Sequence, residues 1–165
     1  MQISWTTSWP STAVIDPRAV AGVAVQHAVA ALRLEALVYE EAHWCARGST
    51  FYGDHLLYER LRDSARSKAD SLGERAVGLF GEQLVRTLLL RDEMASCPGA
   101  QLACSAGDPL ACAIAAAQHG LSAVESAMAE CDAAGVLTGG FEDLLMSLMS
   151  DSEEASYLLG QRASQ

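Results

Sequence analysis

Two histidines and three carboxylates in the first half of the chain have side chains of the kinds that bind iron. His43 and His55 are followed by Glu59, Asp70 and Glu74. Imidazole nitrogens and carboxylate oxygens together suit iron(II), with zinc and manganese as competitors. We therefore interpret these five residues as candidate ligands of an iron site and the rest of the chain as the scaffold that positions them.

Four of these residues fall on a predicted helix over residues 51–80 and share one face of it. His55 and Glu59 are one helical turn apart, and so are Asp70 and Glu74. At about 100° per residue all four side chains point away from the apolar side of this helix. From Glu59 to Asp70 the helix rises about 16 Å, which is too far for one or two metal ions to bridge. The spacing therefore excludes one site built within a single subunit.

A two-fold dimer would bring the two ends of this row together. If two copies of the helix pair antiparallel and cross between residues 64 and 65, Glu59 of one copy faces Asp70 of the other. The same register places His55 opposite Glu74. An isologous dimer of this kind carries two identical sites, each shared between subunits.

Ordinary surface electrostatics is the alternative interpretation of the same row. Charged pairs at i,i+4 are common on solvated helix faces, and Arg62, Arg66 and Arg75 are available as partners. In the dimer register, Asp63 would instead face Arg66 across the axis. His43 ends an apolar stripe, a position where a hydrogen-bonded core histidine is also common.

The periodicity of the whole chain predicts an all-α domain over residues 17–162, preceded by a tail over residues 1–16. An Asp16–Pro17 pair starts the first helix, and Gly48, Gly81, Gly135 and Gly160 mark helix ends. The predicted helices cover residues 17–45, 51–80, 82–94, 108–134 and 138–159, with a loop over 96–109. Four long helices with a short one between the second and third form a four-helix bundle.

The amino-acid composition limits the classes of binding partner that are expected. The chain has 11 basic and 21 acidic residues and a formal net charge of −10. An acidic surface does not favour nucleic acid or anionic lipid but attracts metal cations. No apolar run reaches the roughly 18–20 residues of a membrane span, so none is expected. The cysteines are odd in number and lack a CxxC pair, which predicts free thiols in a cytoplasmic protein; they are Cys45, Cys97, Cys104, Cys112 and Cys131.

Two segments resemble a known family. His43-Trp44, followed by Gly48, Phe51 and His55, is similar to the signature of the Dps family, the mini-ferritins of the ferritin-like fold. The segment Asp70-Ser71-Leu72-Gly73-Glu74-Arg75 resembles the D-x-x-x-E-R segment of that family. The resemblance extends over about residues 30–80 and implies the four-helix bundle with its short extra helix.

The resemblance also implies an activity and an assembly. Dps proteins form hollow dodecamers, built from two-fold dimers, that oxidise iron(II), commonly with hydrogen peroxide, and store the ferric product. The positions of the family's ferroxidase ligands hold metal-competent residues here, with Glu59 where aspartate is more usual. Trp44 matches a tryptophan near the iron site, where an indole can absorb stray oxidising equivalents; an ordinary packing aromatic is its alternative.

DNA binding is not expected, although relatives bind DNA through basic tails. The first sixteen residues contain no Lys or Arg, and the C-terminal tail contains only Arg162. Phosphate binding needs several cations within reach. A structural or DNA-associated shell of Dps type without ferroxidase activity is the alternative function.

Two further predictions concern acidic residues elsewhere. Glu40-Glu41-Ala42-His43 is an ExxH motif of the kind found in di-iron bundles, but such sites need a second ExxH, and the chain has none. Four carboxylates around the predicted turn between the last two helices would line a cation entry pore or form an ordinary acidic turn; they are Glu130, Asp132, Glu142 and Asp143.

Overall fold

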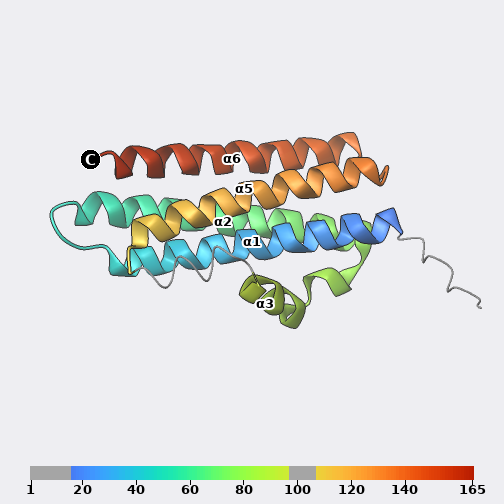
Figure 1. The fold of residues 1–165 in the computed structure, drawn as a ribbon, viewed down its shortest axis with the longest axis horizontal. Coiled ribbons are helices and arrows are strands. Elements are labelled where there is room, and N and C mark those ends of the chain that lie inside the picture. The colour runs from blue at the N-terminus through green and yellow to red at the C-terminus, as the bar shows by residue number, and fades with distance from the viewer. Residues whose placement is uncertain (1–15, 97–106) are drawn as a thin grey trace, which may run out of the picture.

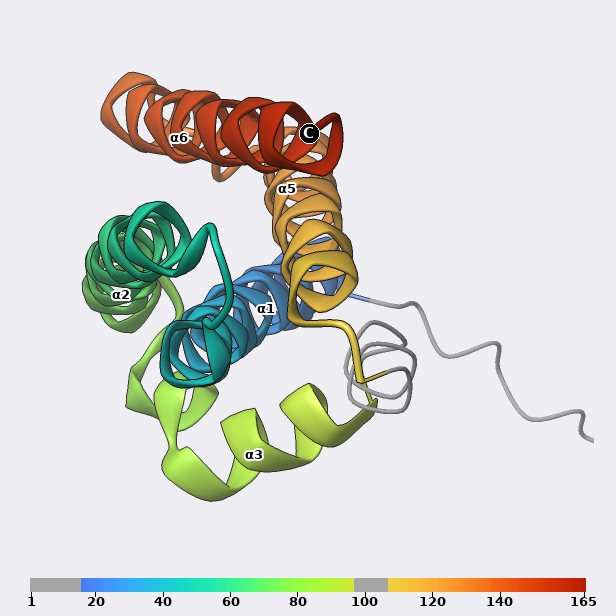
Figure 2. The ribbon, with the colours of Figure 1, turned by 90° about the vertical axis from the view of Figure 1, so that its left-hand side faces the viewer.

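A computed structural model describes residues 16–96 and 107–165, and all regular structure in them is helical. The elements are α1 (Pro17–Cys45), α2 (Phe51–Phe80), a 3-10 turn η1 (Glu82–Val85), α3 (Thr87–Ser96), α5 (Pro109–Ala133) and α6 (Gly139–Ala163). The four long helices run side by side along the long axis, and the short α3 lies outside them against α1 (Figures 1 and 2). The predicted four-helix bundle with a short extra helix is confirmed. Residues 1–15 of the predicted tail, and Cys97 and Cys104, lie outside the described residues.

The predicted helix starts and turns are present. The Asp16 side chain accepts a hydrogen bond from the backbone N–H of Arg18 at 3.0 Å and caps α1, with Pro17 in the first turn. Gly48 has a φ of +83°, a left-handed conformation that glycine adopts without steric cost. The chain therefore reverses between α1 and α2, so that the last turn of α1 lies beside the first turns of α2.

Two predicted boundaries are wrong. The segment after α2 is not one short helix over residues 82–94, because Arg86 is extended (φ −63°, ψ 132°) and separates η1 from α3. Gly160 does not end the fourth helix, which continues to Ala163. The last turn is held by tertiary contacts, since Leu159 is buried and Arg162 bonds Asp54 of α2. These contacts outweigh the cost of about 1 kcal/mol that a glycine imposes inside a helix.

Small and aliphatic side chains fill the bundle interior. The apolar stripe of α1 that His43 ends is buried along Ala21, Val25, Ala28, Leu32, Ala36 and Tyr39, while His43 itself is half-buried. Alanines of α5 and leucines of α2 and α6 pack against the stripe. Alanine faces allow helices to approach closely, which suits the contact between α1 and α5. Two charged side chains are also buried at the centre, Glu35 at 0% and Lys68 at 2% exposure.

Helix α1 has the length and hydropathy that a membrane crossing requires, the one such helix in the described part of the chain. In the fold, 56% of its most apolar window is buried inside the bundle. Its buried apolar residues contact other helices of the same chain, while Val23 and Leu37 are exposed.

Candidate metal centre

The candidate site is built around a pair of histidines where α1 meets α2. The imidazole rings of His43 and His55 stack with centroids 3.7 Å apart and planes inclined by 24°. His43 Nδ1 lies 3.0 Å from the backbone oxygen of His55, and His55 Nδ1 lies 3.2 Å from that of His43. One chain therefore contributes both histidines to the same place.

These hydrogen bonds determine which ring nitrogens can bind a metal. A backbone oxygen only accepts, so each Nδ1 carries the hydrogen and donates it. In a neutral imidazole this leaves the lone pair on Nε2, the arrangement of metal-binding histidines whose other nitrogen donates to a carbonyl. His43 and His55 are both only half-buried, so the pair is accessible from outside the bundle.

The three candidate carboxylates lie on the outer face of α2. Asp70 and Glu74 are exposed, Glu59 and His55 are partly exposed, and the opposite side of α2 is buried in the core. The predicted orientation of this face, away from the bundle, is thus observed. Within the described residues no three His, Cys, Asp or Glu side chains converge to hold a metal ion. The single chain brings together His43 and His55, while Asp70 and Glu74 lie further along α2.

Of the three candidate carboxylates on α2, only Glu59 lies within ion-pair distance of an arginine of this helix. Arg62 Nη2 lies 2.8 Å from Asp63 Oδ1 and 3.8 Å from Glu59 Oε1. Arg66 pairs with Glu40 of α1, so in the single chain both members of the predicted Asp63–Arg66 pair have partners of their own.

The two carboxylates on the far half of α2 differ from these. Within the described residues, neither Asp70 nor Glu74 forms a hydrogen bond or ion pair. A salt-bridged surface therefore accounts for Glu59, but it does not account for Asp70 or Glu74.

Large apolar side chains surround the histidine pair on the protein surface. We call them the apolar rim: Trp44, Phe51, Tyr52 and Leu56, which are 44–73% exposed. Trp44 itself is 72% exposed, so it is not a packing residue of the chain's own core. An exposed apolar group of this size on a monomer marks an interaction site.

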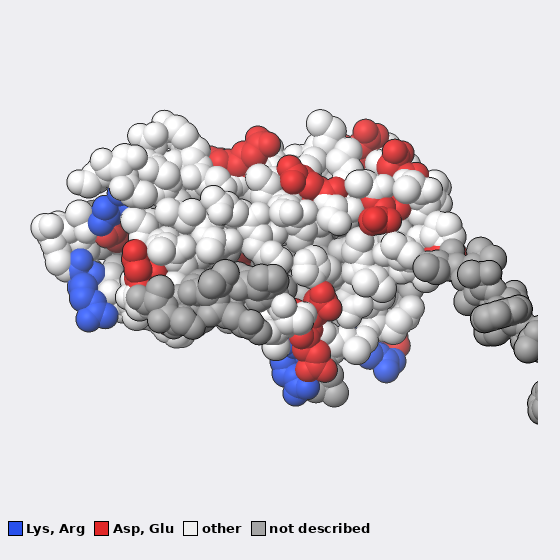
Figure 3. Space-filling model, in the orientation of Figure 1, with Lys and Arg blue, Asp and Glu red and all other residues white. Residues whose placement is uncertain are grey.

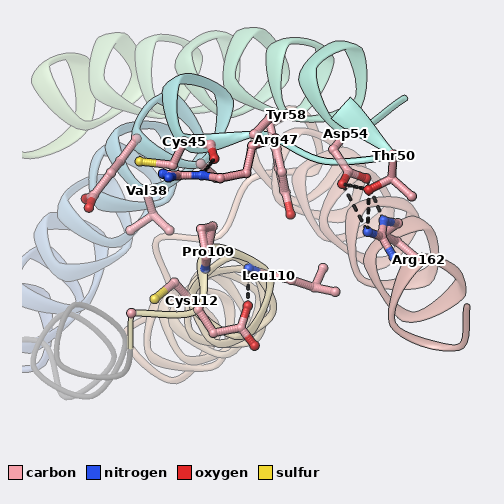
Figure 4. A pocket seen from close by; sticks show the side chains of 15 residues that line it. Val38, Cys45, Arg47, Thr50, Asp54, Tyr58, Pro109, Leu110, Cys112 and Arg162 are labelled. Atoms are coloured by element: carbon pink, nitrogen blue, oxygen red, sulfur yellow. Dashed lines mark hydrogen bonds and ion pairs between the residues drawn. The ribbon is translucent and has the colours of Figure 1, made fainter. Parts of the chain in front are cut away.

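A separate cavity of about 630 Å³ lies at the same end of the bundle, between the ends of α1, α2, α5 and α6. Figure 4 shows Asp54 and Thr50 joined to Arg162, and the Tyr58 side chain directed into the cavity. The hydrogen bond from Arg162 holds the pKa of Asp54 below its usual range, and burial is the main cause that raises the pKa of Tyr58 to about 12. None of the five candidate ligands lines this cavity.

The four carboxylates of the predicted pore lie where α5 ends and α6 begins. Glu130 and Asp132 are in the last turns of α5, and Glu142 and Asp143 are in the first turns of α6. On the face shown in Figure 3, acidic side chains gather toward this end of the bundle. A pore would need further subunits around this end, so its existence stays a prediction.

Sequence reasoning missed the polar contacts inside the fold. Glu35 and Lys68 form a buried ion pair, and Asp54 binds Arg162 across 108 positions of the chain. One signal was present for the first pair: Glu35 follows Leu32 by three and precedes Tyr39 by four, which places it on the buried stripe. Pairing between distant helices leaves no such local signal.

Neither the family models nor the curated proteins compared with this sequence include a match. The described helices nevertheless have the arrangement of a ferritin-like four-helix bundle. More narrowly it is the fold of Dps proteins, so the resemblance to that family is confirmed at the level of the fold.

Three solved structures have a fold similar to that of this chain. The chain matches Dps from Microbacterium arborescens in the high iron form (TM-score 0.73, 19% identity, 93% of this chain and 99% of that one). It also matches Dps from Thermosynechococcus elongatus (TM-score 0.76, 19% identity, 90% and 93%). The third is DpsC from Streptomyces coelicolor (TM-score 0.74, 21% identity, 95% and 91%).

Proposed function

We propose that this chain is the subunit of a cytoplasmic mini-ferritin of Dps type, which oxidises iron(II) with hydrogen peroxide or oxygen and stores the ferric product in a hollow shell of two-fold dimers. The observation that carries the proposal is the stacked pair of His43 and His55. Both rings donate Nδ1–H to backbone oxygens, and both keep a lone pair on Nε2. His55 lies on the outer face of α2 that presents Asp70 and Glu74, and His43 of α1 lies against His55.

In the proposed site, one subunit contributes His43, His55 and Glu59, and its mate contributes Asp70 and Glu74. The imidazoles bind iron(II), and the carboxylates stabilise the harder ferric ion that forms. Asp70 and Glu74 need no rearrangement of ion pairs before they bind, since neither has a partner within the described residues. Iron is the substrate of this reaction.

The surface of α2 supports the two-fold pairing in detail. The register that places Glu59 opposite Asp70 also places Tyr52 of one copy opposite Val77 of the other, and both are exposed. Leu56 then faces Gly73. A methyl group added at Gly73 would meet no atom of its own chain within 4 Å, so this glycine leaves open surface for a partner.

A second large residue faces a glycine in the same register. Phe51, which is 46% exposed, lies opposite Gly78, where an added methyl group also meets nothing within 4 Å. Large side chains opposite small ones give the close fit that stable interfaces have. The apolar rim and these glycines are thus complementary parts of one proposed interface.

We propose no role for DNA. The net charge of −10 and the acidic face in Figure 3 oppose phosphate binding. A gel-shift experiment at low salt tests whether the protein binds DNA. We expect the DNA to migrate unretarded, and retarded DNA would contradict the proposal.

Ferric absorbance after mixing with iron(II) and peroxide tests the function. The wild-type protein should oxidise iron faster than buffer does, and His43→Ala or His55→Ala should lower the rate by more than about tenfold. His27→Ala, which removes another imidazole from α1, is the matched control and should keep the rate. Oxidation no faster than in buffer, or equal rates for His55→Ala and wild type, would sink the proposal.

A further inference from the structure

One inward-facing residue from each long helix meets at the centre of the bundle. We call these four residues the polar layer: Glu35 of α1, Lys68 of α2, Gly120 of α5 and Ser152 of α6. Lys68 Nζ lies 3.1 Å from Glu35 Oε1 and 2.9 Å from Ser152 Oγ. All four residues are buried, with Glu35 and Ser152 at 0% exposure.

The two oxygens of Glu35 have different surroundings. Oε1 accepts hydrogen bonds from Lys68 and from the Tyr39 hydroxyl at 3.0 Å. Oε2 is buried and has no hydrogen-bond partner within the described residues. It packs against Gly120, where an added methyl carbon would clash with it. The layer therefore holds a carboxylate in a space that only a glycine on α5 leaves open.

Charge balance in this layer depends on one side chain. Lys68 is the only lysine of the chain, and it is 2% exposed. Burial raises the pKa of Glu35, while the charge and hydrogen bond of Lys68 act in the opposite direction. A buried ionised group is costly unless it is paired, and lysine is almost never fully buried without a partner. Each charge thus makes the burial of the other tolerable.

The layer also occupies the position at which helix bundles hold metal ions. Di-metal bundles direct carboxylates from all four helices, with two ExxH histidines, toward the centre. Here the four inward positions supply one carboxylate, one ammonium, one hydroxyl and one glycine. The ExxH glutamate Glu40 is instead bound to Arg66 near the surface.

We propose that the polar layer is a cation site whose resident cation is the Lys68 ammonium, which balances Glu35 and keeps divalent metal ions out of the bundle centre. Metal ions then bind only outside the core. This inference does not rest on the proposed function, because the layer lies inside a single chain.

The first test exchanges the resident cation. In a His43→Ala/His55→Ala background, which removes the proposed shared site, Lys68→Glu places two carboxylates in the layer. We expect cobalt(II) to raise the melting temperature of this variant and to give a visible d–d absorption band. Lys68→Gln, which adds no charge, and the parent background should show neither response. A cobalt response of equal size in the parent or in Lys68→Gln would overturn the proposal.

The second test needs no metal and applies even if Lys68→Glu fails to fold. Lys68→Met alone leaves the Glu35 carboxylate without its cation, so the melting temperature should fall by about 10 °C or more. Lys68→Met/Glu35→Met removes both charges and should recover most of that loss. The single variant Glu35→Met completes the comparison. If the double variant lowers the melting temperature by the sum of the decreases in Lys68→Met and Glu35→Met, the two charges do not balance each other. A folded Lys68→Glu without any cobalt response would likewise contradict the proposal.

Discussion

His43 and His55 hold each other in place, because each ring donates its Nδ1 hydrogen to the backbone oxygen of the other residue, at 3.0 and 3.2 Å. The rings stack at 3.7 Å between centroids. Removing one ring therefore deletes a ligand and the stacking contact of the remaining ring, while the backbone oxygen that this ring binds stays in place. The two histidines should behave as one unit.

This coupling predicts non-additive losses of metal affinity. His43→Ala and His55→Ala should each weaken cobalt(II) binding by roughly 10- to 100-fold, and the double variant should be little weaker than either single one. Calorimetric titration of the three variants measures the effect. Independent ligands would instead give a double variant whose loss is the product of the single losses.

Gly73 gives a prediction in which stability and assembly change in opposite directions. Gly73→Leu should stabilise α2 in the single chain by up to about 1 kcal/mol, since glycine is a poor helix former. The new side chain would meet Leu56 of the mate in the proposed interface, so the dimer should weaken. Light scattering after size exclusion measures the assembly.

Gly160→Leu is the matched control, because Gly160 is also a helical glycine with no atom within 4 Å of an added methyl group; Gly160 is exposed and Gly73 is half-buried. It should stabilise α6 without changing the assembly. Unchanged assembly of Gly73→Leu would contradict the proposed register.

His119 predicts a dependence of stability on pH. Burial, and then the nearby His27, lower the pKa of His119, whose ring lies 5.2 Å from that of His27. The unfolded chain binds a proton at this residue near pH 6.5, and the folded chain binds it only at lower pH. Stability should therefore fall as the pH drops below about 6.5.

His119→Gln removes this titration and keeps a polar side chain. Its melting temperature should fall less than that of wild type between about pH 7.5 and about pH 5. The other three histidines are unchanged between the two proteins, so the difference between the two curves reports on the replacement of His119. If the melting temperatures of wild type and His119→Gln fall equally with pH, His119 is not the residue responsible for the pH dependence.

Cys131 should be the slowest of the described thiols to react. It is 0% exposed, and burial together with Glu130 raises its pKa to about 11. Cys45 and Cys112 are only half-buried and line the cavity at the other end of the bundle. Alkylation at about pH 8 with peptide mapping should label Cys131 much more slowly in the native protein than in the unfolded chain. Equal rates in the two states would contradict its burial.

Local signals in the sequence were enough to predict most of the fold. Asp16 and Asp108 cap helices that begin at prolines, and Gly135 with a φ of +67° follows α5. Gly160 misled the prediction because a glycine in a helix resembles a stop signal unless the contacts of Leu159 and Arg162 are known. The break at Arg86 could not be predicted, because arginine has no intrinsic tendency to end a helix.

The outer face of α2 could be predicted because its residues share one helical period. The stacking of His43 on His55 could not, since it depends on how α1 and α2 pack. The polar layer was missed for the same reason: Glu35, Lys68 and Ser152 stand on three different helices, and nothing local indicates that they meet.

Mixed assemblies test the shared site most directly. Neither His55→Ala nor Asp70→Asn/Glu74→Gln should oxidise iron alone, because every site in each homodimer lacks ligands. A mixed dimer would contain one intact site and one that lacks both ligand sets, so equal co-expression should restore about a quarter of the wild-type rate. Co-expression of His43→Ala with His55→Ala, which damage the same half, should restore none. Recovery in the first mixture alone is the predicted result, and no recovery above the separate variants would contradict a site shared between two subunits.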